Sequence, residues 1–152
     1  MTDLDSAASA VAYAYLASQL PGEKKRYAAL YRSNAEDLVL RKENSLAFEE
    51  AGLSPSDIMY LDDLSALDLA ELGVSIALVD HNRLAADFGR RDDAVVAIID
   101  HHADEKHHFS ASPRLIQVPT GSCSSLVTLH FSKQVSVGQF PVDLAKLVVS
   151  YV

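Results

Sequence analysis

Two short apolar runs, each ending abruptly in an acid, are the clearest feature of the hydrophobic pattern along the chain. Residues 95–99 read Val-Val-Ala-Ile-Ile before Asp100, and residues 74–79 read Val-Ser-Ile-Ala-Leu-Val before Asp80. Short β-branched runs of this kind are typical of strands buried on both faces, as in a parallel sheet. The pattern therefore predicts two parallel strands with polar side chains at their carboxyl ends, where open α/β sheets bind ligands.

Helical and extended segments alternate along the rest of the chain. The pattern predicts helices over 7–20, 35–51, 122–130 and 142–152, strands over 27–31, 58–61 and 115–118, and a helical turn or loop over 64–72. Alternation with short connections predicts an α/β fold, in which a mainly parallel β-sheet is flanked by helices on both faces.

Composition and charge restrict the class of protein. With 152 residues, 49% of them hydrophobic, the chain fits one globular domain with a substantial core. We expect a cytosolic protein, because no apolar run reaches the roughly 20 residues of a membrane span and the N-terminus lacks the pattern of a signal peptide. The net charge of −8 argues against non-specific nucleic-acid binding. Cys123 is the single cysteine, so a metal site would use oxygen and nitrogen ligands, which favours Mg²⁺ or Mn²⁺.

The residues after the two acid-tipped strands have the chemistry of metal ligands. They are Asp80, His81 and Asn82 after one strand, and Asp100, His101 and His102 at the end of the other. Burying a carboxylate and two imidazoles beside a core strand is costly unless something pairs with them, and a divalent cation satisfies all three. A solvated loop is the alternative for a single Asp-His-His triplet, but the second acid-tipped strand favours one shared site.

Two further polar clusters each admit two interpretations. Asp3 and Asp5 precede the first predicted helix, where acidic residues also stabilise the helix dipole without any other role. The segment Ser122–Ser125 follows Gly121 at a predicted helix N-terminus. Its backbone N–H groups are suited to an anion, and an ordinary N-cap is the alternative.

Basic and imidazole side chains in the connecting segments are weaker candidates. Arg83, Arg90 and Arg91 lie between the acid-tipped strands, where they could hold phosphates, although surface salt bridges are the commoner use. His107 and His108 lie in a hydrophilic connection, and we expect an exposed loop there rather than metal ligands.

Taken in order, four motifs resemble the DHH phosphoesterase superfamily. They are Asp3-Leu4-Asp5-Ser6, Leu78-Val79-Asp80-His81-Asn82, Ile98-Ile99-Asp100-His101-His102 and Gly121-Ser122-Cys123-Ser124-Ser125. Within the superfamily, the first and last motifs and Asp37-Leu38-Val39-Leu40-Arg41 resemble eukaryotic cytosolic exopolyphosphatases. Those enzymes are relatives of family II inorganic pyrophosphatases and prune-type proteins.

The resemblance implies a dinuclear Mg²⁺ or Mn²⁺ site. Asp3 and Asp5 would each bind one ion, Asp80 would bridge the two ions, and His101 would bind the second. His102 would face the substrate phosphate and act in catalysis, while Asp100 would orient its neighbours. The residues expected near the substrate phosphate are His81, Asn82, Ser122 and Ser124.

The activity that the resemblance implies is hydrolysis of the terminal phosphoanhydride of inorganic polyphosphate, with release of orthophosphate. Two neighbouring ions would lower the pKa of a shared water to give a hydroxide, and would clamp the phosphoryl oxygens during in-line displacement. The alternatives are a manganese-dependent inorganic pyrophosphatase, a prune-like phosphodiesterase, or an inactive fragment that serves as a binding module. His102 argues against the prune-like alternative, because prune-type proteins often carry Arg at that place.

The chain also departs from the family pattern at both ends. Family members begin with a strand that carries Asn or His four residues before the first Asp, and this position would precede Met1. They also carry a further metal-binding Asp beyond the helix that ends at Val152, and a second domain that grips the polyanion. We therefore expect residues 1–152 to be a partial DHH domain, without its first strand and its C-terminal substrate-binding domain.

Overall fold

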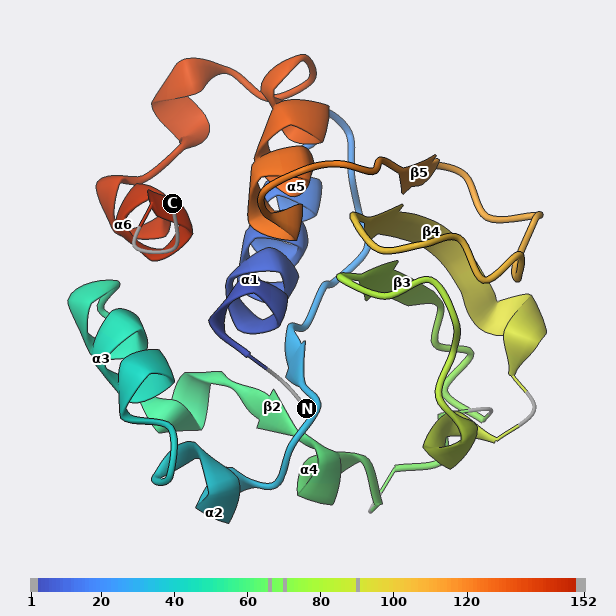
Figure 1. Cartoon of the computed structure of the whole chain (residues 1–152), viewed down its shortest axis with the longest axis horizontal. Helices are drawn as coiled ribbons and strands as arrows, with labels where there is room; N and C mark the ends of the chain where they lie inside the picture. The colour runs from blue at the N-terminus through green and yellow to red at the C-terminus, as the bar shows by residue number, and fades with distance from the viewer. Residues whose placement is uncertain (1–2, 66, 70, 90, 150–152) are drawn as a thin grey trace.

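The computed structural model (Figure 1) describes residues 3–65, 67–69, 71–89 and 91–149. The helices are α1 (Leu4–Ser18), α2 (Ala35–Leu38), α3 (Lys42–Glu50), α4 (Leu61–Ser65), α5 (Cys123–Ser132) and α6 (Val142–Val149). The strands are β1 (Leu30–Tyr31), β2 (Met59–Tyr60), β3 (Ile76–Val79), β4 (Val95–Asp100) and β5 (Arg114–Ile116). Short 3₁₀ turns occupy Pro55–Asp57, Ala86–Phe88, Asp92–Ala94 and Val137–Gln139.

The described strands pair in parallel and form two separate sheets. β4 lies between β3 and β5 in the larger sheet, and β1 pairs with β2 in the smaller one. Val79 lies opposite Ile99 in the register of β3 and β4. The next residues, Asp80 and Asp100, therefore reach the same edge of the sheet, which brings the two acid-tipped strand ends together.

Helices α1 and α5 lie side by side and cover one face of the larger sheet (Figure 1). Buried alanines such as Ala12 and Ala17 let α1 approach its neighbours closely, and Val127 and Phe131 of α5 fill the same core as Val79 and Ile99. Side chains alternate along a strand, so the other face presents a different set. This set contains Leu78, Val95 and Ile98, and Ala111 from the loop before β5 packs against them.

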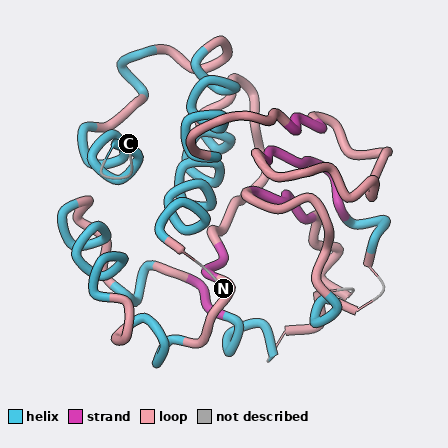
Figure 2. Tube along the Cα trace, viewed as in Figure 1, coloured by secondary structure: helices cyan, strands magenta, loops and turns pink. Residues whose placement is uncertain are grey.

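A second core joins the other side of α1 to the smaller sheet. Its large members are Tyr31, Phe48, Tyr60 and Leu147, from β1, α3, β2 and α6. The Tyr31 ring meets the rings of Phe48 and Tyr60 edge-on, with centroids 6.2 and 6.0 Å apart. Figure 2 shows α3, α5 and α6 around α1, whereas most of the chain around the larger sheet is loop. The edge that carries the acid-tipped strand ends is thus framed by loops on one side and by α1 and α5 on the other.

The structure confirms the predicted α/β class with parallel sheets flanked by helices. Helix α1 begins earlier than expected, because the Asp3 side chain accepts a hydrogen bond from the Ser6 N–H and caps the helix. The helix expected over 35–51 is two helices, α2 and α3. Val39 and Leu40 separate them with 75% and 81% of their surfaces exposed, so no continuous apolar stripe exists to bury there.

Other boundaries also differ from the sequence pattern. The strand expected over 27–31 is limited to β1, and the helical turn expected over 64–72 begins earlier, as α4. The last predicted helix is present as α6, and residues 150–152 lie outside the described residues. Within the described part of the chain, no helix combines the length and the apolar composition needed to span a membrane.

Candidate functional site

The edge formed by the ends of β3 and β4 brings three predicted site residues together. Asp80, His101 and His102 each offer one ligand atom, and these atoms lie within 4.8 Å of one another. Nε2 of His101 lies 3.1 Å from Oδ1 of Asp80, and Nδ1 of His102 lies 3.7 Å from the same oxygen. The predicted convergence of the two strand ends therefore produces a compact group of oxygen and nitrogen donors.

The Asp80 carboxylate is buried and only half satisfied. Its Oδ2 accepts a hydrogen bond from the Ser6 hydroxyl, whereas Oδ1 accepts none. Burial raises the pKa of Asp80, and the nearby Asp5 and Asp3 carboxylates raise it further, against the lowering effect of the Ser6 hydroxyl. A cation at Oδ1 would remove this penalty, because it would pair with the buried charge.

His101 presents a lone pair to the same place. Its Nδ1 lies 3.0 Å from the Thr120 carbonyl oxygen, which can only accept, so Nδ1 carries the proton in the neutral imidazole. Nε2 then faces Oδ1 of Asp80 at 3.1 Å and Oδ2 of Asp5 at 3.6 Å. Acceptors that converge on one point need a proton or a metal ion between them. A backbone carbonyl that fixes the tautomer in this way is a common partner of metal-binding histidines.

Asp5 takes the place at the α5 N-terminus that the sequence suggested for an external anion. Its Oδ2 accepts the Cys123 N–H at 2.7 Å, and its Oδ1 accepts the Ser124 N–H at 3.0 Å and the Ser122 hydroxyl at 3.1 Å. The helix dipole and the unpaired N–H groups favour a negative charge there. Ser122 also caps α5 through the Ser125 N–H, and its hydroxyl lies 2.7 Å from that of Ser124. Phosphate binding by Ser122 and Ser124 stays a prediction, and it would compete with the chain's own carboxylate.

His102 and Asp100 form a hydrogen-bonded pair beside the three-atom group. Nδ1 of His102 donates to Oδ1 of Asp100 over 2.8 Å, and the His102 side chain is 59% exposed. Burial alone would raise the pKa of Asp100, but hydrogen bonds from His102 and Asn82 hold it below its usual range. The hydrogen bond to Asp100 in turn raises the pKa of His102. Because Nδ1 of His102 bonds to Asp100, a ligand of this ring would meet Nε2.

Asn82 lies inside the protein rather than on the surface of the site. Its amide nitrogen donates to Oδ2 of Asp100 over 2.5 Å and to the Ala103 carbonyl over 3.0 Å, and its oxygen accepts the Glu105 N–H at 2.8 Å. A phosphate contact by Asn82 would have to displace one of these bonds. Its predicted phosphate-binding role is untested, and the bonds themselves show that it holds Asp100 in place.

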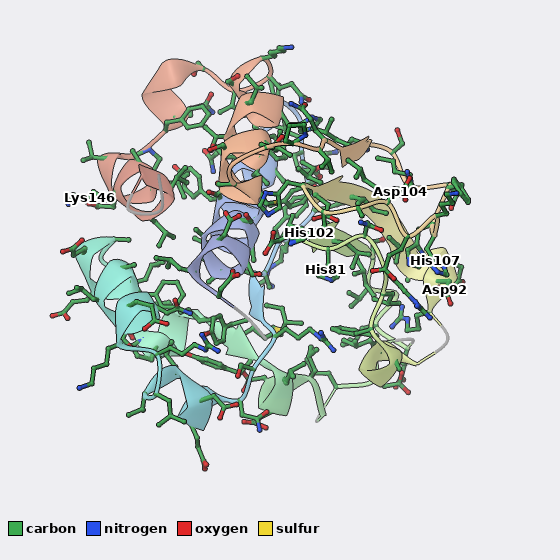
Figure 3. All side chains as sticks on the ribbon, viewed as in Figure 1. His81, Asp92, His102, Asp104, His107 and Lys146 are labelled. Carbon is green, nitrogen blue, oxygen red and sulfur yellow. The ribbon has the colours of Figure 1, made fainter. Side chains whose placement is uncertain are left out.

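His81 and Asp3 lie at the margin of the site. Nδ1 of His81 donates to the Val79 carbonyl over 2.8 Å. Burial lowers the pKa of His81 and the positive charge of Arg32 lowers it further, so Nε2 presents a lone pair. Figure 3 shows His81 and His102 turned toward the middle of the molecule from the ends of β3 and β4. Asp3 caps α1, and its charge acts on Asp80 and His102, but Asp3 is outside the three-residue group.

Sequence reasoning missed three residues that hold the site together. The hydroxyl of Ser6 donates to Asp80, and the carbonyl of Thr120 orients His101. Cys123 bonds to both Asp5 and Asp80. Ser6 and Cys123 lie within two of the four family motifs, and their presence in those motifs was the sequence signal that could have found them. Thr120 acts through its backbone, which leaves no signal in the residue type.

The second histidine pair is not the exposed loop that we expected. Only 1% of the His108 side chain is exposed, and Nε2 accepts the Leu84 N–H at 3.0 Å. The expectation was wrong for His108 because hydropathy does not show that a loop N–H needs a buried acceptor. Arg83 forms a surface ion pair with Glu105 at 3.5 Å, and Arg91 donates to the Val74 carbonyl. Arg90 lies outside the described residues.

The donors at the strand ends fit a divalent cation. The orphaned Oδ1 of Asp80 and the lone pair on Nε2 of His101 converge on one point, with the Asp5 carboxylate beside them. Carboxylate and imidazole ligands together suit Mn²⁺, and the carboxylates also suit Mg²⁺. The described geometry thus supports a metal-binding group without fixing the identity or number of the ions.

Comparisons with known proteins find a family and relatives that cover most of the chain. The model of the DHH family, N-terminal domain, matches residues 1–150. A Schizosaccharomyces pombe protein named "Putative exopolyphosphatase" is 37% identical over 130 residues, which are 85% of this chain and 33% of that protein. The proteins named "Exopolyphosphatase PRUNE1" of Rattus norvegicus and Homo sapiens are 26% and 25% identical, over 82% and 83% of this chain and 28% of each relative. The chain thus spans about a third or less of the length of these relatives.

Proposed function

This chain belongs to the DHH family, and from that premise we propose that it carries the metal-binding half of an exopolyphosphatase active site. The reaction would be hydrolysis of the terminal phosphoanhydride of inorganic polyphosphate, with release of orthophosphate. The family and the names of the relatives support a hydrolase of phosphoester or phosphoanhydride bonds. Polyphosphate as substrate, two Mn²⁺ or Mg²⁺ ions as cofactors and the cytosol as location are the finer parts of the proposal.

One observation carries the metal-dependent part of this proposal. Oδ1 of Asp80 is buried without a hydrogen-bond donor, and Nε2 of His101 faces it at 3.1 Å with its tautomer fixed by Thr120. Folding such a group costs free energy in the absence of a cation, so its presence indicates a ligand. Asp5 and Asp3 would complete the set, Asp5 from the α5 N-terminus and Asp3 from the start of α1.

The protein's own residues would then act as follows. When bound, divalent cations supply a nucleophilic hydroxide and neutralise charge on the phosphoryl oxygens. Asp80 and His101 would hold the ions, and His102 would face the terminal phosphate with the proton on Nε2. The attacking oxygen would bond to the terminal phosphorus, and the bond from that phosphorus to the bridging oxygen would break. His102 would donate its proton to the departing oxygen, while Asp100 stabilises the imidazolium.

Orthophosphate release from long-chain polyphosphate and from pyrophosphate, with Mn²⁺ or Mg²⁺, tests the proposal. His101→Ala is the test variant and His107→Ala is the matched control, because both remove a loop imidazole but only His101 faces Asp80. We expect release from polyphosphate by the unaltered chain and by the control, and loss of release in His101→Ala. Preference for pyrophosphate would favour the pyrophosphatase alternative.

Mn²⁺ binding, measured by calorimetry, separates an inactive binding module from an incomplete enzyme. A working metal site should bind Mn²⁺ and lose affinity in His101→Ala. The proposal would be contradicted if neither substrate released orthophosphate and if Mn²⁺ bound weakly and equally to the unaltered chain and to His101→Ala. This result would favour the binding module. Tight binding without release would show that the metal site is present and that this chain does not hydrolyse polyphosphate.

A further inference from the structure

We infer that Cys123 is a positioning residue that sets the relative placement of the Asp5 and Asp80 carboxylates. The inference rests on the proposed function, because the consequence of the placement is affinity for the metal. Cys123 is the first residue of α5 and is fully buried, 43 positions after Asp80 and 118 positions after Asp5 in the chain. Cys123 forms hydrogen bonds to both Asp5 and Asp80.

The thiol of Cys123 fixes the backbone at Asp80. The Asp80 N–H donates both to Sγ of Cys123 at 3.2 Å and to the Ile99 carbonyl at 3.0 Å. The S–H donates to the same Ile99 carbonyl at 3.2 Å. Asp80 itself has a left-handed backbone, with φ of 64°, which a non-glycine residue adopts only at a cost. The thiol therefore helps to hold the conformation that points the Asp80 carboxylate toward His101.

The backbone of the same residue fixes Asp5. The Cys123 N–H donates to Oδ2 of Asp5 at 2.7 Å, and Oδ2 is the atom that lies 3.6 Å from Nε2 of His101. A shift of Cys123 would thus move both carboxylates relative to His101. Metal sites depend on such supporting contacts, and losing a hydrogen-bond partner of a ligand typically costs about 10- to 100-fold in metal affinity.

Val127 provides the matched control for a purely structural role. It lies one turn further along α5, is also fully buried, and fills the same core as Cys123. Its aliphatic side chain makes no hydrogen bond. Cys123→Ala and Val127→Ala both leave a small cavity in this core, and only the first removes a contact to Asp80. Cys123→Ser restores a donor and an acceptor at the same position.

The first measurement is Mn²⁺ affinity, by calorimetry on the 152-residue chain, with the thermal midpoint of each metal-free variant alongside. We expect Cys123→Ala to weaken Mn²⁺ binding about tenfold, while Val127→Ala at a similar loss of thermal stability changes it less than about twofold. Cys123→Ser should recover most of the affinity. Equal affinities in Cys123→Ala and Val127→Ala would overturn the inference even if polyphosphate hydrolysis is observed.

The second measurement needs no metal. Amide hydrogen exchange at Asp80, followed by NMR in a chelator, should be about fivefold faster in Cys123→Ala than in Val127→Ala, because one acceptor of a shared hydrogen bond is gone. Unchanged exchange would contradict the positioning role. If the unaltered chain binds no Mn²⁺, the proposed metal centre fails, and this measurement still decides whether Cys123 positions Asp80.

Discussion

The two histidine pairs of this chain, His101-His102 and His107-His108, are alike in sequence and opposite in structure. Each pair follows acidic residues and lies after β4, but Nε2 of His101 faces two carboxylates. Nε2 of His108 instead accepts a hydrogen bond from the Leu84 N–H, and its Nδ1 lies 3.6 Å from the exposed Asp92. In Figure 3, His107 and Asp92 lie at the outer edge of the molecule, whereas His102 faces its middle.

The comparison shows that residue type does not separate a site from a structural contact. The separating property is whether the polar atoms are satisfied by the chain itself. Around His108 the imidazole completes a loop, because its Nε2 accepts the Leu84 N–H within the chain. Around His101 a buried acceptor on Asp80 is left without a donor, which is unfavourable unless a ligand completes it.

Asp80→Asn should have the largest effect, which is on Mn²⁺ affinity. An unchanged affinity would contradict the distinction between the two histidine pairs. The amide keeps the shape and can still accept the Ser6 hydrogen bond, but it removes the charge that binds a cation. We expect Mn²⁺ affinity to fall by more than the roughly 100-fold seen when only a supporting partner is lost. Because burial and the Asp5 charge disfavour the Asp80 carboxylate, the metal-free variant should be at least as stable as the unaltered chain.

Calorimetry with Mn²⁺ and thermal unfolding in a chelator measure both effects. Asp92→Asn is the control, since it changes an exposed carboxylate next to the second histidine pair. A loss of stability without a change in affinity would mean that Asp80 is a structural residue like His108.

His108→Ala should have the next largest effect, on stability alone. It removes a buried ring and leaves the Leu84 N–H without its acceptor, so the free energy of unfolding should fall by about 2–3 kcal/mol. Chemical denaturation in a chelator measures this loss, and His107→Ala, which spares that acceptor, should change it by less than about 0.5 kcal/mol. A fall in Mn²⁺ affinity in the His108 variant would show that the second pair also serves the site.

The sequence predicted the elements that depend on regular patterning. The acid-tipped strands, their parallel pairing and the convergence of Asp80 with His101 follow from short apolar runs and from the geometry of parallel sheets. The break between α2 and α3 did not follow, because Leu38, Leu46 and Phe48 were compatible with one amphipathic helix. In the structure Val39 and Leu40 turn outward between the two helices. The spacing of apolar residues along the chain does not show which of them will be buried against another element.

The details of the site that were not predictable depend on contacts distant in sequence. An α5 N-terminus suits an anion, but only the packing of α1 against α5 shows that the anion is Asp5. Likewise, Thr120 orients His101 through a backbone carbonyl, which any residue type would supply. The sequence therefore indicated the candidate ligands better than the groups that hold them.

The smallest expected effect concerns Asp104, which anchors the loop of the second histidine pair. Its carboxylate accepts hydrogen bonds from the Arg114 guanidinium at 2.5 and 3.1 Å and from the Lys106 N–H at 2.7 Å. These contacts, the Arg114 guanidinium first, hold the pKa of Asp104 below its usual range. The stabilisation is therefore complete above the ordinary pKa of Asp and is lost as the pH falls through the lowered value in the folded protein.

Asp104→Asn should thus lower the thermal midpoint slightly at neutral pH, and the difference from the unaltered chain should shrink as the pH falls from about 7 to about 3. Arg114→Lys keeps the charge but loses the bidentate contact, so its thermal midpoint should lie between those of the unaltered chain and Asp104→Asn. Thermal unfolding at a series of pH values, in a chelator, makes the measurement. Parallel curves for the unaltered chain and Asp104→Asn would show that this ion pair adds no pH-dependent stability.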